Sequence, residues 1–331
     1  MTTVAPWIAA QAKHLLGQPG HAWLLQGPSG LGQYELALAL ARGWLCDQPT
    51  PQGACGHCPS CHAIDVHGHT DLCVLMPETI MLELGWPLSE KAQADIDDKK
   101  RKPSKEIRVE AMRDAVEFAQ RTSGRGRGKA VLVYPAERMN HVTANTLLKT
   151  LEEPAGELRF VLASEAAHQL LPTIRSRCLV HTMAWPREDE AVAWLQARGV
   201  KAADAPALLE AAGGRPDDAL GFSAAGHGPQ IWSMLPRALA RGDAGVLAGW
   251  SPAQAVEALQ KLCHDLLAVA AGAPPRFFPA AALPAGPSLK ALSEWGRDLA
   301  RTARTVEHPF NPGLMLEALV SQARSALNSK A

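Results

Sequence analysis

The segment Gly27–Tyr34, "GPSGLGQY", has the glycine spacing of a phosphate-binding loop. A complete loop of this type reads G-x-x-x-x-G-K-[ST], in which the lysine reaches the β- and γ-phosphates and the hydroxyl binds Mg²⁺. Gln33 and Tyr34 stand at those two positions. The glycines of the loop are Gly27, Gly30 and Gly32. A glycine motif also fits a simple turn, so we expect the segment to keep the shape of the loop and to bind no ATP in its own subunit.

The strand expected at 130–134, "AVLVY", lacks the acidic end that nucleotide hydrolysis requires. In ATPases with this loop, an aspartate that follows such a strand holds Mg²⁺. Here Pro135 and Ala136 follow the strand, and Glu137 is the first acid after it. The lysine, the loop hydroxyl and the aspartate are therefore all missing. Three separate losses argue against ATP hydrolysis by this chain.

Four of the seven cysteines, spaced C-x8-C-x2-C-x2-C, have the spacing of a metal site. They are Cys46, Cys55, Cys58 and Cys61. Four thiolates suit tetrahedral Zn²⁺, and such an ion is structural because no ligand position stays open. An iron–sulfur cluster is the chemical alternative, but the further cysteine and proline of that pattern are absent. A chance group of free thiols is the remaining alternative, and we predict a zinc module over 46–61.

The elements that must position these residues follow from the apolar pattern. Runs at 22–26, 130–134 and 159–164 have the length of buried strands, and helical spacing follows the glycine loop. Alternating strands and helices predict a mostly parallel α/β sheet. After residue 189 the pattern is helical throughout. The segment 79–106 carries dense mixed charge and is predicted to be a mobile surface insertion.

The charge balance excludes a strong general attraction to polyanions. Basic and acidic residues number 33 each, so no global positive field draws the chain to nucleic acid or to an anionic membrane. The first residues lack a basic stretch followed by an apolar core, and no run of about 18 apolar residues occurs. We therefore expect a soluble, cytoplasmic protein without membrane contact. A basic turn with Arg125, Arg127 and Lys129 either contacts DNA or is simply solvated.

Five motifs in a fixed order resemble the AAA+ clamp-loader family over about residues 5–185. They are "HAWLLQGPSGLG", the four-cysteine insertion, "HTD" (69–71), "NTLLKTLEEP" (145–154) and "TIRSRC" (173–178). The resemblance implies a RecA-like AAA+ parallel-sheet domain at 1–184 that carries the zinc module. It further implies a small helical lid domain at 185–225 and an all-α collar domain at 226–331, through which subunits form a ring.

The same resemblance implies a subunit that does not hydrolyse ATP itself. Its partners would be the gamma or tau subunits, which hydrolyse ATP, and the delta subunit, in a five-subunit ring that loads the sliding clamp onto primed DNA. Arg177 of "SRC" resembles the arginine finger that reaches ATP in a neighbouring subunit. Arg215 is similar to the sensor-2 arginine of the family, and Ser164 to the sensor-1 residue. The enzymatic status of the chain alone is left open, and zinc is the implied cofactor.

Other interpretations of these residues stay open. An active AAA+ ATPase, such as a gamma/tau-like motor subunit, would need the lysine that Gln33 replaces. A zinc-dependent nucleic-acid-binding protein would bind DNA in a salt-dependent way. For Arg215 a solvated arginine at a helix start is the favoured interpretation, whereas Arg177 is alternatively a packing residue. The segment "LLKTLEEP" is an amphipathic helix ended by Pro154, or else Asn145 and its "LEE" residues face a neighbour.

Overall fold

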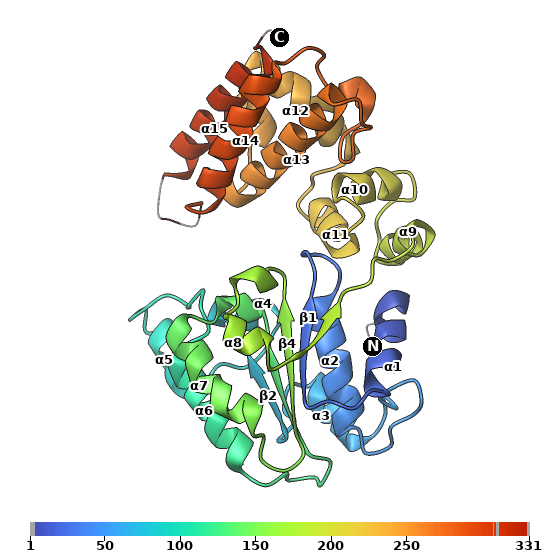
Figure 1. Cartoon of the computed structure of the whole chain (residues 1–331), viewed down its shortest axis with the longest axis vertical. Coiled ribbons are helices and arrows are strands. Elements are labelled where there is room, and N and C mark those ends of the chain that lie inside the picture. The colour runs from blue at the N-terminus through green and yellow to red at the C-terminus, as the bar shows by residue number, and fades with distance from the viewer. Residues whose placement is uncertain (1–3, 307, 309–310, 330–331) are drawn as a thin grey trace. The chain divides into compact units, whose positions relative to one another are not determined.

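The computed structural model describes residues 4–306, 308 and 311–329. The chain forms two compact units, Met1–Pro186 and Arg187–Ala331, here called the first unit and the second unit. All five strands lie in the first unit, and the second unit is helical (Figure 1). Among the described residues, none of the helices has both the length and the apolar character needed to span a bilayer.

A five-stranded parallel sheet forms the centre of the first unit, in the order β2-β3-β4-β1-β5. The strands are β1 (Ala22–Gln26), β2 (Leu72–Leu75), β3 (Lys129–Val133), β4 (Leu158–Ser164) and β5 (Leu179–Thr182). The central strands β3, β4 and β1 are almost wholly buried, as expected when helices cover both faces of a parallel sheet. In the register, Leu24 of β1 lies opposite Leu162 of β4.

Helices cover the sheet on both faces (Figure 1). One face packs against α6 (Val109–Gln120) and α7 (His141–Glu152), which contribute Met112 and Leu147 to the main core. On the opposite face α2 (Gln33–Leu45) contacts β1, β3 and β4, and α1 (Pro6–Leu16) packs on α2. The remaining short helices of the first unit are α3 (Pro59–Asp65), α4 (Glu78–Glu83), α5 (Glu90–Asp97), α8 (Pro172–Arg175), η1 (Ala136–Arg138) and η2 (Ala167–Gln169).

The charged segment 79–106 differs from the mobile insertion that its composition predicts, because it contains α4 and α5. Its two ends are joined through the buried carboxylate of Glu78. That carboxylate accepts bonds from Arg101 at 2.5 and 2.9 Å and from the backbone N–H of Ser104 at 2.8 Å, and it pairs with Arg108 at 3.1 Å. Burial raises the pKa of Glu78, but these bonds and charges outweigh it and lower the pKa overall. Some of the charged residues in and next to this segment therefore hold it in an ordered structure, rather than only contacting solvent.

The second unit consists of helices. They are α9 (Glu188–Ala197), α10 (Ala205–Ala211), α11 (Pro216–Ala224), α12 (Pro229–Arg241), α13 (Pro252–Ala270), α14 (Leu289–Ala303) and α15 (Pro312–Leu327), with the short η3 (Ala244–Leu247) and η4 (Ala280–Ala282). Helices α9, α10 and α11 pack together, and α13 packs against α14 and α15. The predicted parallel α/β sheet followed by helical segments is confirmed. The division of the helical part at residue 225 stays a prediction.

Candidate functional site

The glycine loop lies where the sequence places it, between the end of β1 and the start of α2. Gly30 and Gly32 have φ angles of +75° and +87°, which favour glycine. Gly32 is also the N-cap of α2, and a Cβ there would lie 2.8 Å from Cδ1 of Ile8 in α1. These glycines are therefore required by the backbone turn and by the packing of α1, whether or not a phosphate is bound.

Gln33 closes the loop on itself. Its side-chain amide donates hydrogen bonds to the carbonyl oxygens of Gly27 at 3.0 Å and Pro28 at 2.6 Å, and the residue is 2% exposed. In a complete loop the lysine at this position carries its charge to the β- and γ-phosphates. The neutral amide of Gln33 instead satisfies carbonyl groups inside the loop. The loop is thus held in shape by the chain's own atoms, without an anion.

Tyr34 occupies the position of the Mg²⁺-binding hydroxyl and lies in an aromatic cluster. Its hydroxyl accepts a hydrogen bond from Nε1 of Trp86 at 2.7 Å, and its ring lies 5.5 Å from that of Tyr134. The hydroxyl of Tyr134 donates to Glu165 at 2.9 Å. Burial raises the pKa of Tyr34 and also, together with the charge of Glu165, that of Tyr134. Both phenols stay protonated and neutral at physiological pH, which makes them poor ligands for Mg²⁺.

Glu137, the first acid after β3, is bonded within its own unit. One carboxylate oxygen accepts a hydrogen bond from the hydroxyl of Ser164 at 2.8 Å, and the other accepts from the backbone N–H of Glu165 at 3.1 Å. Ser164, the residue similar to sensor 1, is fully buried at the end of β4. Glu137 therefore fixes the end of β4, and neither side chain is directed to a metal by these contacts.

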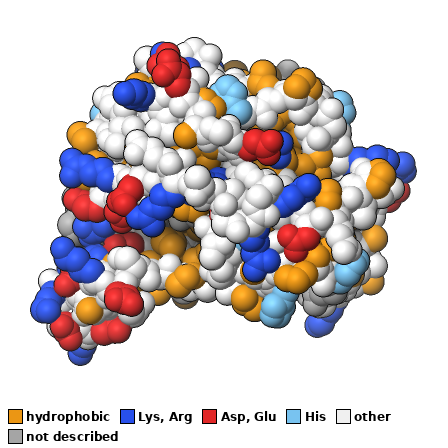
Figure 2. All heavy atoms as spheres, turned by 90° about the horizontal axis from the view of Figure 1, so that it is seen from below, with side chains coloured by type: hydrophobic (Ala, Val, Ile, Leu, Met, Phe, Trp, Pro, Cys, Tyr) orange, Lys and Arg blue, Asp and Glu red, His pale blue; other side chains and the backbone are white. Residues whose placement is uncertain are grey.

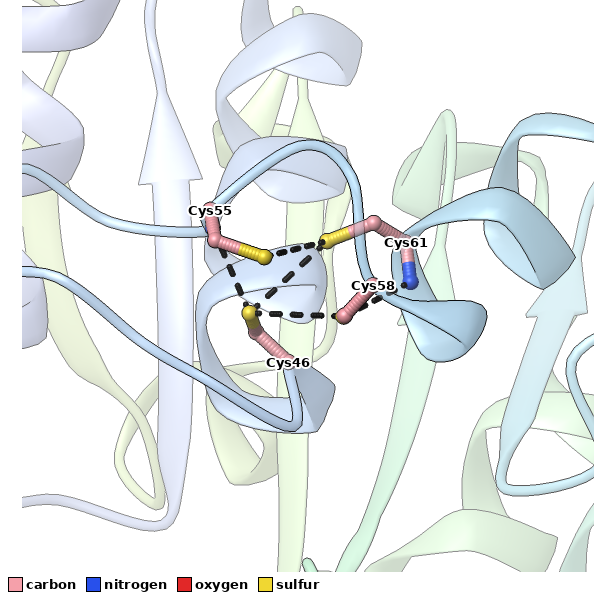
Figure 3. Close-up of side chains that lie close together, drawn as sticks. All are labelled: Cys46, Cys55, Cys58 and Cys61. Carbon is pink, nitrogen blue, oxygen red and sulfur yellow. Dashed lines mark hydrogen bonds between the residues drawn. The ribbon is translucent and has the colours of Figure 1, made fainter.

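The four cysteines predicted to bind metal lie together at the end of α2 and the start of α3 (Figure 3). The sulfur of Cys46 lies 3.8 Å from that of Cys58 and 3.7 Å from that of Cys61, and the sulfurs of Cys55 and Cys61 are 4.0 Å apart. A tetrahedron with metal–sulfur bonds of about 2.3 Å has sulfur–sulfur separations of about 3.8 Å. The four thiols therefore form an arrangement that can hold one metal ion.

Backbone hydrogen bonds and burial change the pKa values of these thiols in different directions. The N–H groups of Cys55 and Cys61 donate to the sulfurs of Cys46 at 3.3 Å and Cys58 at 3.4 Å. Hydrogen bonding from the backbone of His57 lowers the pKa of Cys55 to about 7, whereas burial raises the pKa of Cys61 to about 12. A bound cation would have to displace the proton of Cys61, so metal binding at this site releases protons.

A hydrogen-bond network connects the cysteine module, residues 46–61, to the basic turn before β3. Asp47 accepts bonds from the backbone and hydroxyl of Ser60 at 3.1 and 2.7 Å, and that hydroxyl accepts from Arg125 at 3.3 Å. Asp71 of "HTD" is 1% exposed and accepts from the hydroxyl of Ser123 and from the N–H groups of Gly124 and Arg125 at 2.8 to 3.0 Å. The side chain of Arg125 is thus directed at the cysteine module.

On the face that Figure 2 shows, Lys and Arg side chains are interspersed with Asp, Glu and apolar groups. This face is therefore mixed in charge, as the equal numbers of basic and acidic residues lead one to expect. This mixture gives poor support to a general nucleic-acid-binding surface, which requires clustered positive charge.

Arg177 lies in the short connection between α8 and β5 of the first unit. Its Nη1 donates to the carbonyl oxygen of Thr173 at 2.9 Å, and its Nη2 forms an ion pair with Glu152 at the end of α7. The side chain of Arg177 is 28% exposed, and that of Glu152 is 52% exposed. No pattern in the sequence indicates the contact with Glu152. Asn145, the other α7 residue suggested to face a neighbour, is exposed.

Arg215, the residue similar to sensor 2, is bonded inside the second unit. Its Nε donates to the carbonyl oxygen of Ala212 at 2.8 Å, and its Nη2 pairs with Asp218 at 2.9 Å and Glu257 at 3.0 Å. Glu257 also pairs with the buried Lys261 at 2.9 Å. These contacts join the start of α11 to α13, so the solvated arginine favoured from the sequence is wrong: the side chain is 14% exposed and paired with two carboxylates.

Comparison with known proteins adds a family. Residues 8–186 match the family model described as "DNA polymerase III, delta subunit". The DNA polymerase III subunit delta' of Pseudomonas aeruginosa is 38% identical over 212 residues, which are 63% of this chain and 57% of that protein. That of Escherichia coli strain K12 is 34% identical over 221 residues, 65% of this chain and 59% of that protein. These matches span less than two thirds of the length of both relatives.

Two further similarities concern related subunits. The DNA polymerase III subunit tau of Salmonella typhimurium is 32% identical over 164 residues, which are 50% of this chain and 22% of that protein. Among solved structures, a DNA polymerase III gamma subunit-related protein from Thermotoga maritima aligns with 97% of this chain and 99% of its own. The sequence identity is 17% and the TM-score is 0.49.

Proposed function

Since the chain belongs to the DNA polymerase III, delta subunit family, we propose that it is a delta'-type subunit of a clamp loader that does not hydrolyse ATP itself. The observation that carries this proposal is the position of the Gln33 side chain. It fills the loop with hydrogen bonds to Gly27 and Pro28, where a motor subunit would present a lysine to the nucleotide. The rival function, a gamma/tau-like motor subunit, has the tau similarity in its favour, but Gln33 and Tyr34 replace the lysine and the hydroxyl that such a subunit needs to bind Mg·ATP.

In this proposal the chain acts through its neighbours. It occupies one place in a five-subunit ring with gamma or tau and delta subunits, and the ring loads the sliding clamp onto primed DNA. The loop that no longer binds ATP keeps the turn between β1 and α2, which positions α2 on the sheet. Arg177 supplies a guanidinium to ATP in the neighbouring subunit, where such a group stabilises the charge of the transition state.

The proposed cofactor is one structural Zn²⁺ ion. Cys46, Cys55, Cys58 and Cys61 would hold it, and their number leaves no position for a substrate. The ion would supply a cross-link between the end of α2 and the start of α3. The chain's own residues continue this connection, since Asp47 and Ser60 bond to each other and Ser60 to Arg125.

The proposed organisation has three parts. They are an ATPase-like domain at 1–184, a helical lid domain at 185–225 and a collar domain at 226–331. The collar would form the contacts that close the ring. Localisation in the cytoplasm follows from the proposed role in replication.

The test uses the full chain alone and in a reconstituted loader. Isothermal titration of the isolated chain with Mg·ATP should show no micromolar binding, and its hydrolysis should stay at background. Adding the chain to its ATPase and delta partners should restore clamp loading on primed DNA, measured by a fluorescent clamp. Micromolar Mg·ATP affinity, or clamp loading that does not depend on the chain, would contradict the proposal.

A further inference from the structure

The ion pair between Glu152 and Arg177 joins two elements that are distant in sequence. Glu152 is the last residue of α7, and Arg177 follows α8, so the pair connects the ends of two helices of the first unit. Nη1 of Arg177 donates at the same time to the carbonyl oxygen of Thr173 at 2.9 Å. The guanidinium is therefore held against its own subunit by one charged and one neutral acceptor.

The position of Glu152 is unfavourable for α7 taken alone. A helix carries partial negative charge at its C-terminal end, where acidic residues are destabilising and basic residues are stabilising. Helix α7 nevertheless ends with Glu152 followed by Glu153. The charge of Arg177 offsets this misfit for Glu152. Glu152, the residue that holds the arginine, is thus at an unfavourable position in its helix. Unfavourable local choices of this kind are common at functional sites.

Arg177 also has unused hydrogen-bonding capacity in this position. Its Nε atom is buried and has no hydrogen-bond partner within the described part of the chain. Nη1 also makes a long hydrogen bond to the hydroxyl of Ser176 at 3.5 Å. A guanidinium bonded to phosphate can use two parallel N–H groups at once, which makes such pairs strong. The contacts with Glu152 and Thr173 leave the side chain able to gain bonds by moving to a phosphate.

We propose that Glu152 is a positioning residue that restrains Arg177 until a nucleotide in the neighbouring subunit draws the guanidinium away. The inference rests on the proposed function, because it takes Arg177 as the arginine finger. A γ-phosphate carries more negative charge than one carboxylate and accepts two bonds from the fork, so it outcompetes Glu152. Before nucleotide binds, the pair keeps the long side chain folded onto its own unit and lowers its exposed charge.

The experiment compares reconstituted clamp loaders that contain Glu152→Gln, Arg177→Ala or both changes. The clamp- and DNA-stimulated ATPase is measured at subsaturating ATP, and the rate of the Arg177→Ala ring is subtracted to isolate the contribution of the finger. Glutamine keeps the size of the side chain and removes its charge. The finger-dependent kcat/KM should rise about two- to fivefold, the range set by an exposed ion pair. The double variant should match Arg177→Ala, because Glu152 acts only through the arginine.

Three controls make the result specific. Glu157→Gln removes another exposed carboxylate close to α7 and should leave the rate at the wild-type value. Glu152→Asp keeps the charge and should return the rate toward wild type. Thermal melting of each isolated variant should show an unchanged Tm.

The outcomes separate this inference from the proposed function. An unchanged or lowered finger-dependent kcat/KM in the Glu152→Gln ring, while Arg177→Ala still impairs it, would overturn the restraint by Glu152 alone. A lowered value would mean that Glu152 supports the active geometry instead. Wild-type ATPase in the Arg177→Ala ring would overturn both the restraint and the assignment of the finger.

Discussion

The side-chain amide of Gln33 lies 2.6 Å from the carbonyl oxygen of Pro28, so the residue that replaces the loop lysine bonds the loop itself. A side chain bonded in this way contributes to holding the loop in shape. The chain therefore keeps the glycine spacing of the loop, although the contacts described above direct neither a cation nor an acid at a nucleotide. This relationship leads to the first two predictions.

Replacing Gln33 with alanine should destabilise the first unit by about 1–3 kcal/mol, because two hydrogen bonds from a buried side chain are lost, each worth about 0.5–1.5 kcal/mol. Urea denaturation followed by circular dichroism measures this change in the free energy of unfolding. Gln120→Ala, which truncates an exposed glutamine at the end of α6, is the matched control and should change stability by less than about 0.5 kcal/mol. Equal stability of the two variants would show that the hydrogen bonds of Gln33 contribute nothing.

Replacing Gln33 with lysine should not create an ATPase. Lysine restores one ligand for phosphate, but Tyr34 stays in its aromatic cluster and Glu137 stays bonded to Ser164. Mg²⁺ would still lack its hydroxyl and its aspartate. Phosphate release by the purified variant, measured with a coupled assay, should equal that of a sample without protein. Turnover by this single variant would refute the claim that the metal ligands are also lost.

Much of the fold was predictable from the sequence, since short apolar runs flanked by loops identify the buried strands β1, β3 and β4. The four cysteines were predictable for a similar reason, because their spacing is local. Contacts between distant segments were not. The bond between Tyr34 and Trp86 and the pair of Glu152 with Arg177 depend on the path of the backbone, which no periodicity records. The charge density of the segment 79–106 predicted a solvated insertion. The burial of Glu78 beside it also depends on the path of the backbone, so composition could not indicate it.

Metal analysis of the purified chain should find one zinc per chain, and Cys58→Ser should lose most of it. The expected loss follows because three thiolates leave a tetrahedral site incomplete. Cys263→Ser changes a buried thiol of α13 and should keep the metal. The metal should also leave as the pH falls, since protons compete for the thiolates, above all for Cys61 with its raised pKa. Iron in the sample, or no metal in a folded chain, would contradict the zinc assignment.

Loss of the metal should loosen the cysteine module and leave the sheet folded. The module lies beside the sheet, whose core is formed by residues of β1, β3, β4, α6 and α7. Hydrogen exchange measured by mass spectrometry should therefore rise at residues 46–61 in Cys58→Ser and stay slow in β3 and β4. Faster exchange throughout the first unit would show that the ion holds the whole domain together.

Asp71→Asn should destabilise the first unit by about 1–3 kcal/mol, because three donors of the basic turn lose a charged acceptor. Burial raises the pKa of Asp71, but hydrogen bonds from Gly124, Arg125 and Ser123 outweigh it, and the pKa is lowered overall. The unfolded value is about 3.9. The carboxylate therefore stabilises the folded chain above that pH, and this stabilisation is lost as the pH falls through the lower, folded pKa.

The measurement for Asp71 is the free energy of unfolding between pH 3 and pH 7. The loss of stability below about pH 4 should be smaller in Asp71→Asn than in the unchanged chain. Asp114→Asn, an exposed carboxylate of α6, should follow the unchanged chain. Parallel pH profiles for all three proteins would mean that Asp71 has the same pKa in the folded and unfolded states.

Arg177→Ala should leave the isolated chain folded and the ring assembled, while it slows ATP hydrolysis at one neighbouring site. The side chain is 28% exposed and does not belong to the main core, so its removal should leave that core intact. A finger that is wholly responsible for its site is worth about 10³ to 10⁵ in rate, but the ring should lose less because its other sites keep their own fingers. Arg177→Lys should rescue poorly, because an ammonium keeps the charge and loses the planar fork. Gel filtration reports assembly, and stimulated ATPase with clamp loading reports function. Clamp loading at the wild-type rate by the Arg177→Ala ring would show that Arg177 only packs against Thr173 and Glu152.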